Sequence, residues 1–126
     1  MLKFTIKADP VSINKAYSTN SQGRRFLTGE GKSFKHSCYW DTYHASRGLK
    51  ALFKYPIEVH LDFYLNNRLR VDLDNIVKLT IDGICGSKYD RKLVFQDDRE
   101  IKRLELEKFY DPENTRIEVT IIQLEN

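Results

Sequence analysis

The chain has 126 residues, of which 40% are hydrophobic and 31% charged, and its formal net charge at pH 7 is +3. This length fits a single domain over residues 1–126 whose core needs no disulfide or zinc site to fold. No apolar run approaches the roughly 20 residues of a membrane-spanning helix. The opening MLKFTIKADP also lacks the apolar core of a signal peptide. We therefore expect a cytoplasmic globular protein with no membrane partner.

Cysteine and histidine patterns argue against a zinc or redox site. Cys38 and Cys85 lie far apart without CxxC spacing, so we expect two reduced structural thiols. No metal-ligand spacing relates the three histidines, and we expect each of them to be solvated: His36, His44 and His60. Metal chemistry in this chain would therefore have to rest on carboxylates.

The first third predicts a strand, a loop and a helix. Apolar and polar residues alternate over residues 2–8, as in a half-buried strand. The polar stretch from about Asp9 to Glu30 predicts a long loop of the kind that is often functional. Residues Glu30–Leu52 then predict a helix, because its apolar residues recur on one stripe: Phe34, Cys38, Ala45, Leu49 and Leu52. Asp41 interrupts this stripe.

Three aromatic residues of this helix fall beside the apolar stripe: Tyr39, Trp40 and Tyr43. Three interpretations stay open for them. They could widen the buried face, contact another subunit, or form a platform on which nucleic-acid bases stack.

The remaining sequence predicts an α+β fold, with a small, mostly antiparallel or mixed sheet and two main helices. Strict alternation over Ile57–Leu65 predicts a second strand. The next helix is expected from about Asp74 to Ile84, closed by Gly83 and Gly86. The remaining expected elements follow in chain order: a short strand at 93–95, a bulged strand around 101–106, a hairpin loop at YDPENT and a last strand at 117–121.

Acidic residues gather in the run DLDNIVKLTID, which holds Asp72, Asp74, Lys78 and Asp82, and the pair Asp97-Asp98 follows downstream. A helix cap would explain one of these acids, and a solvated salt-bridge row would explain Lys78 and Asp82. The combination points further, since hard divalent cations prefer several carboxylate oxygens. With no histidine cluster, Mg²⁺ or Mn²⁺ is expected rather than zinc.

Basic residues flank both acidic clusters. A site that holds cations and also approaches a phosphate backbone requires this arrangement. The candidate DNA-binding residues are Lys15, Arg24, Arg25, Arg68, Arg70 and Arg91. Ordinary solubilising charge is the alternative.

The spacing of the acids and the lysine resembles the RusA family of Holliday junction resolvases. The pattern runs Asp72-Leu73-Asp74-Asn75-x-x-Lys78-x-x-x-Asp82 and continues with Asp97-Asp98-x-x-Ile101. The segments DPVSINKAY, residues 9–17, and TGEGKSFK, residues 28–35, resemble the N-terminal part of the family. The resemblance therefore covers nearly the whole chain.

The resemblance implies a homodimeric, Mg²⁺-dependent α+β endonuclease that cuts four-way DNA junctions by symmetric nicks. The catalytic residues it implies are Asp72, Asp74, Lys78 and Asp98, of which the three aspartates would bind the metal. Asp82 and Asp97 are second-tier candidates. Two departures from the family pattern, which could alter the DNA contact, are Val71 in place of a basic residue and a longer segment between Asp82 and Asp97.

Two other classes of function compete with the nuclease. One is a catalytically idle module that binds junctions or single-stranded nucleic acid through its basic loops and aromatic residues. The matched carboxylates argue against this module, because they would repel phosphate unless a cation lay between. The other is a protein-interaction domain, supported only by the surplus aromatic residues of the first helix.

Overall fold

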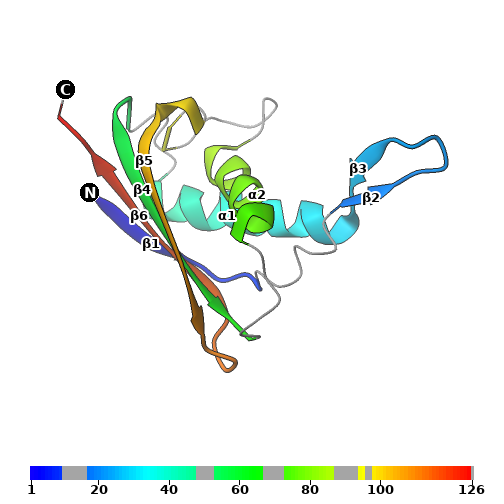
Figure 1. The fold of residues 1–126 in the computed structure, drawn as a ribbon. Coiled ribbons are helices and arrows are strands. Elements are labelled where there is room, and N and C mark those ends of the chain that lie inside the picture. Colours follow the sequence, from blue (N-terminus) through cyan, green and yellow to red (C-terminus); the bar gives the residue numbers. More distant parts are fainter. Residues whose placement is uncertain (10–16, 48–52, 67–72, 87–93, 96–97, 126) are drawn as a thin grey trace.

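The computed structural model of the chain describes residues 1–9, 17–47, 53–66, 73–86, 94–95 and 98–125. A four-stranded mixed sheet forms its centre, in the order β1-β6-β4-β5 (Figure 1). The strands are β1 (Leu2–Ile6), β4 (Ile57–Leu65), β5 (Ile101–Tyr110) and β6 (Arg116–Gln123). β6 runs antiparallel to both β1 and β4, whereas β5 runs parallel to β4. The predicted α+β class is therefore confirmed.

Two helices, α1 (Gly29–Ser46) and α2 (Leu73–Cys85), cover one face of the sheet (Figure 1). β4 supplies the centre of the core through side chains that alternate along the strand and are almost fully buried: Ile57, Val59, Leu61, Phe63 and Leu65. The residues between them mostly face away from the helices and are polar. The predicted bounds of β4 are confirmed, and those of α2 are confirmed to within one residue at each end.

The first helix begins close to the predicted residue but ends earlier. Thr28 caps its N-terminus, since the Thr28 hydroxyl accepts a hydrogen bond from the Gly31 N–H at 3.2 Å. Arg47 takes the left-handed backbone conformation, with φ of 56°, and this stops α1 at Ser46. The predicted helix to Leu52 is therefore wrong from Arg47 onward, and residues 48–52 lie outside the described residues.

The predicted loop between Asp9 and Glu30 contains a small antiparallel hairpin of β2 (Tyr17–Thr19) and β3 (Arg25–Leu27). Its turn is stabilised by the Asn20 side chain, whose oxygen accepts hydrogen bonds from the N–H groups of Gln22 and Arg24, each at 2.9 Å. The prediction of a structureless loop is wrong for residues 17–27. The hairpin strands are exposed and short, so no buried alternation marked them.

The C-terminal strands do not form the predicted hairpin, because β4 lies between β5 and β6 and pairs with both. The predicted bulge in β5 is confirmed: Ile57 pairs with Ile101, but Glu58 pairs with Arg103, which leaves Lys102 as the additional residue. The expected short strand at 93–95 is absent from the described residues 94–95. Val94 and Phe95 instead form a bend and bury their side chains in the core.

The two helices cross closely at Gly83. Gly83 is buried within α2 and does not end the helix; that role belongs to Gly86, whose φ of 83° suits only glycine well. Cys38 and Cys85 are buried and form no disulfide, as predicted. Among the described residues, no helix is both long enough and apolar enough to cross a membrane.

Candidate active site on the helical side

The first turn of α2 carries the central part of the acidic motif. Asp74 lies there with an exposed side chain, and Lys78 follows one turn later. The Lys78 ammonium lies 4.0 Å from the Asp82 carboxylate, and the Lys78 side chain is 75% exposed. Such an exposed pair contributes little to stability, so Lys78 remains accessible to a substrate. Asp72 lies outside the described residues.

Asp98 lies in a different part of the molecule. It begins the short helix η2 (Asp98–Glu100), which directly precedes β5, and its side chain is exposed. Because Ile101 pairs with Ile57, η2 lies at the end of the sheet where β4 and β5 begin. Figure 1 shows the first turn of α2 away from η2. Asp97 lies outside the described residues.

The described part of one chain therefore carries Asp74 and Asp98 on separate elements, the first turn of α2 and η2. No group of three or more His, Cys, Asp or Glu side chains within it is arranged to hold a metal ion. The donor type nevertheless suits a hard cation, since both residues offer exposed carboxylate oxygens. The ligand set of Asp72, Asp74 and Asp98 stays a prediction.

Arg24 and Arg25 lie on the β2–β3 hairpin, which projects past the N-terminal end of α1 (Figure 1). Both side chains are exposed. The Arg25 guanidinium lies 4.1 Å from the centre of the Tyr17 ring, a cation–π contact that orients it. The other predicted DNA-binding residues lie outside the described residues: Lys15, Arg68, Arg70 and Arg91.

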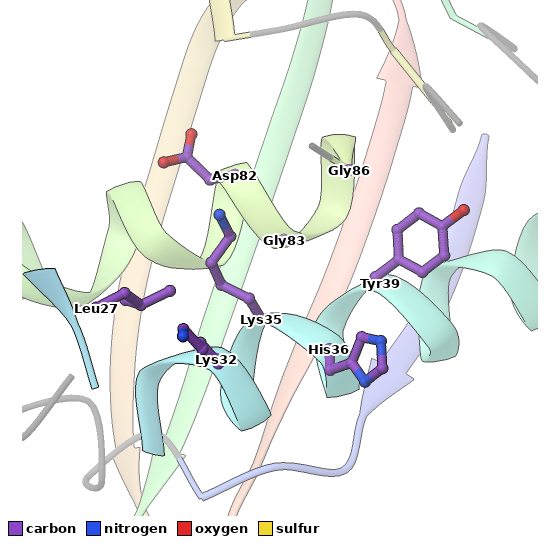
Figure 2. Close-up of a pocket in the computed structure, with 8 residues that line it drawn as sticks. All are labelled: Leu27, Lys32, Lys35, His36, Tyr39, Asp82, Gly83 and Gly86. Carbon is purple, nitrogen blue, oxygen red and sulfur yellow. The ribbon is translucent and has the colours of Figure 1, made fainter. Parts of the chain in front are cut away.

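A cavity of about 170 Å³ opens between α1 and α2 (Figure 2). Its lining residues are Leu27, Lys32, Lys35, His36, Tyr39, Asp82, Gly83 and Gly86. Figure 2 shows the Lys35 side chain directed from α1 toward the Asp82 side of α2. The cavity thus joins a second-tier acid to basic residues that were not among the predicted site residues. The helical spacing of 32, 35, 36 and 39 is the signal that could have placed them on one face.

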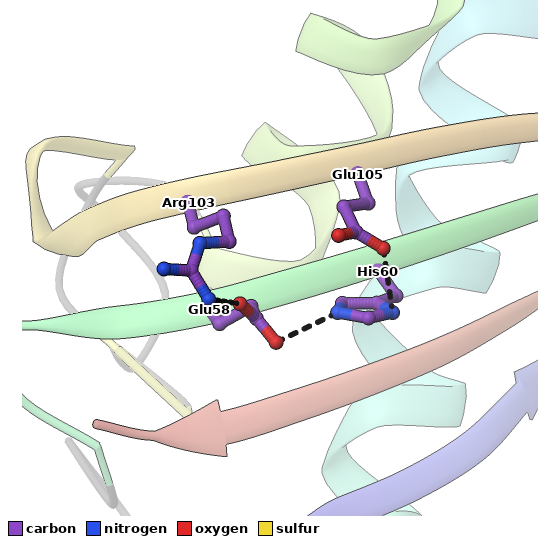
Figure 3. A network of polar contacts seen from close by, with 4 residues as sticks. All are labelled: Glu58, His60, Arg103 and Glu105. Carbon is purple, nitrogen blue, oxygen red and sulfur yellow. Dashed lines mark hydrogen bonds and ion pairs between the residues drawn. The ribbon is translucent and has the colours of Figure 1, made fainter.

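The face of the sheet opposite the helices carries a polar cluster that spans β4 and β5 (Figure 3). Glu58 contacts the His60 ring at 2.9 Å and accepts a hydrogen bond from Arg103 at 2.6 Å. The other ring nitrogen of His60 lies 3.4 Å from Glu105. His60 is therefore held between two carboxylates, and the prediction that it is simply solvated is wrong. Strand neighbours two residues apart share a face, which explains the contact.

The charges on this face also shift the pKa values of two of its carboxyl groups. The pKa of Glu58 lies below its usual value, first because of the hydrogen bond with His60 and then because of that with Arg103. The pKa of Asp62 on the same face is raised by burial and by the nearby charge of Glu118. Carboxylates on this face repel one another and would repel a phosphate backbone.

An α+β domain with exposed carboxylates and a lysine on one helix, beside a basic hairpin, fits the class of proteins that act on nucleic-acid phosphates. The chain matches the family model of endodeoxyribonuclease RusA over residues 8–122, nearly its whole length. It belongs to the RusA endodeoxyribonuclease family. The matched region includes all four predicted catalytic positions. None of the curated proteins compared with the chain matches it.

Proposed function

We propose that this protein is a Mg²⁺-dependent, structure-selective endodeoxyribonuclease that resolves four-way Holliday junctions by paired symmetric nicks, in DNA recombination and repair. Membership of the RusA family over residues 8–122 carries this proposal. The exposed acid–lysine row on α2 supports it, because a row that served only stability would contribute little there. A protein with this role acts on DNA in the cytoplasm.

The proposed metal-binding residues are Asp72, Asp74 and Asp98, which offer the carboxylate oxygens that Mg²⁺ or Mn²⁺ prefers. A cation held there would supply Lewis-acid chemistry, by making a water acidic enough to attack and by offsetting negative charge on the leaving 3′ oxygen. Lys78 contributes a point charge beside the scissile phosphate and stabilises charge that develops on it. Asp82, whose carboxylate lies 4.0 Å from the Lys78 ammonium, is the neighbouring acid of the same row.

We further propose that the active unit is a two-fold homodimer. Ligands of one Mg²⁺ lie about 2.0–2.1 Å from it, so two carboxylates that share an ion must nearly touch. Within one chain, the first turn of α2, which carries Asp74, lies away from η2, which carries Asp98 (Figure 1). A second protomer that places its Asp98 against Asp74 of the first would complete the ligand set. Two-fold symmetry then makes two such sites, which suits two nicks on opposed strands.

The test is a nicking assay on a synthetic four-way junction and on a linear duplex of matched length, each with Mg²⁺ or with a chelator. We expect paired nicks in the junction only, and only with Mg²⁺. The Asp74→Asn variant should lose more than about a hundredfold in rate, since even residues that merely support a metal ligand cost 10–100-fold. It should keep its junction affinity, because removing negative charge does not weaken attraction to phosphate.

The idle binding module predicts a different result. In that case the wild-type protein would bind the junction tightly but leave it uncut with both Mg²⁺ and Mn²⁺. Loss of binding together with cleavage in Asp74→Asn would instead mark Asp74 as a helix cap with a structural role.

A further inference from the structure

The outward face of α1 carries an aromatic patch that the core does not explain. Phe34 and Cys38 bury the inward face of this helix. The aromatic patch on the other side is formed by His36, Trp40, Tyr43 and His44. Tyr39, which contacts Trp40, is itself buried and widens the buried face of the helix. Trp40 is 44% exposed, which is unusual for so large an apolar side chain.

Neighbouring rings hold Trp40 in place. Its ring centre lies 5.3 Å from that of Tyr39 and 5.3 Å from that of Tyr43, in edge-to-face geometry. The Trp40 indole N–H donates to the His36 ring at 3.4 Å. The indole is therefore fixed without being covered. A fixed, exposed ring loses little conformational entropy when a flat group stacks on it.

Basic side chains lie between this patch and the hairpin. α1 holds Lys32 and Lys35 against Glu30 and Asp41, and Arg47 follows as its C-cap. The Asp41 carboxylate accepts a hydrogen bond from the Lys7 backbone N–H at 2.8 Å. Lys32 and Lys35 line the cavity beside Tyr39, with Asp82 on its far wall (Figure 2). On the opposite face of the sheet, by contrast, the basic side chains Arg103 and Arg116 are already paired with carboxylates.

From this arrangement we propose that the outward face of α1 binds unpaired, single-stranded DNA. Bases would stack on Trp40 and its aromatic neighbours, while Lys32 and Lys35 would contact the backbone phosphates. This is the combination by which proteins hold single strands without reading their sequence. The proposal rests on the junction nuclease proposed above, since opening a four-way junction at its centre exposes unpaired nucleotides. The patch meets the exposed acid–lysine row at the cavity that Asp82 lines, and it would orient the junction.

Trp40 is the only tryptophan of the chain, so intrinsic fluorescence reports on this face directly. The experiment titrates the full-length protein, with metal chelated, with a twelve-nucleotide oligothymidylate, a duplex of equal length and a four-way junction. We expect the single strand and the junction to quench Trp40 emission, and the duplex to quench it far less. Unchanged emission at saturating single strand would overturn the proposal.

Variants distinguish base stacking on Trp40 from general electrostatic attraction to the DNA. Trp40→Ala should weaken single-strand affinity, measured by anisotropy of a labelled oligonucleotide, by at least about fivefold, and Trp40→Phe should restore most of the loss. The Lys32→Ala, Lys35→Ala double variant should weaken binding and flatten its salt dependence. The matched control is Phe109→Ala, which removes an exposed ring on the sheet face, stacked on Tyr64. Equal losses in the Trp40 and Phe109 variants would overturn the assignment.

Two further outcomes keep this proposal distinct from the others. If Trp40 emission shifts when the protein is diluted without DNA, the α1 face belongs to an interface between two copies of the chain, and the single-strand proposal fails. If the wild type nicks junctions but DNA does not quench Trp40 emission, the single-strand proposal is refuted while the nuclease proposal is supported. Quenching of Trp40 without any nicking supports single-strand binding by the aromatic patch and refutes the nuclease proposal.

Discussion

Gly83 of α2 lies so close to Cys38 of α1 that a β carbon added to Gly83 would stand 2.6 Å from the Cys38 β carbon. The Lys35 carbonyl oxygen would lie 3.2 Å from the same position. Both neighbours belong to the body of a helix and cannot rotate away. The helices can therefore approach this closely only because residue 83 has no side chain.

Gly83→Ala should destabilise the fold. The added methyl forces the helices apart, which costs about 1–3 kcal/mol, and the better helix propensity of alanine returns up to about 1 kcal/mol. We expect a net loss on the order of 1–2 kcal/mol in urea unfolding. Gly29→Ala is the matched control, because a β carbon at Gly29 meets nothing within 4 Å. Equal stability of the two variants would contradict the close crossing.

Glu58→Gln and Asp62→Asn should change stability in opposite directions at neutral pH. The pKa of Glu58 is lowered in the folded chain, so its charge stabilises the fold above the ordinary value of 4.5, and this contribution is lost as pH falls through the lowered pKa. Glu58→Gln should therefore be less stable than wild type at pH 7 and approach it in acid.

The charge of Asp62 has the opposite effect on stability, because burial and the charge of Glu118 raise its pKa above the ordinary 3.8. As pH rises from 3.8 through the raised pKa, the folded chain holds a proton that the unfolded chain has released, and the wild type loses stability. Asp62→Asn should therefore be the more stable protein at pH 7, with the difference vanishing below pH 3.8. Urea midpoints at pH 3 to 8 measure both variants, and a shared sign would refute the assignment.

Arg24→Ala and Arg25→Ala should each weaken junction binding and flatten its salt dependence. If each arginine contacts one phosphate, each variant should reduce the slope of log affinity against log salt by about 0.9. Lys54→Ala, which removes an exposed lysine three residues before β4, is the control for net charge. Slopes unchanged in both arginine variants would exclude the β2–β3 hairpin from the DNA path.

The sequence predicted most reliably what local periodicity encodes. Alternation gave the bounds of β4, and the apolar stripe gave the buried side of α1 through Phe34 and Cys38. Strand pairing could not be read in this way. β5 and β6 follow one another across a short turn, yet β4 separates them, and only the assembled sheet reveals this. The sequence did not predict the β2–β3 hairpin because its strands have no buried side.

The candidate site shows the same division. The spacing of Asp74, Lys78 and Asp82 placed them on one helix, as found. Whether Asp98 meets them depends on which strand follows η2 and where that strand pairs, which is a property of the topology. Lys35 and His36 line one cavity with Asp82 because α1 crosses α2 at Gly83. Residue types were therefore predictable, whereas their grouping was not.

The last prediction concerns whether one chain or two complete a metal site. Chains carrying Asp74→Asn and chains carrying Asp98→Asn are co-expressed with different tags, and the mixed dimer is isolated by purification on both tags. If each site uses both residues of one chain, every site in this dimer lacks one ligand and nicking is lost. If the site is shared, one of its two sites combines an intact Asp74 with an intact Asp98. It should then nick junctions at about half the wild-type rate, since symmetry gives two equivalent sites.

The product distinguishes the shared site further, because one intact site yields singly nicked junctions and not paired cuts. As a control, a mixed dimer of Asp74→Asn with the Asp74→Asn, Asp98→Asn double variant restores no Asp74 and should be inactive in either arrangement. An inactive Asp74→Asn/Asp98→Asn mixed dimer would refute the shared site while leaving the dimer intact. Failure of the two tags to co-purify would refute the dimer itself. Within one chain, the first turn of α2, which carries Asp74, lies away from η2, which carries Asp98, and this arrangement favours the active result (Figure 1).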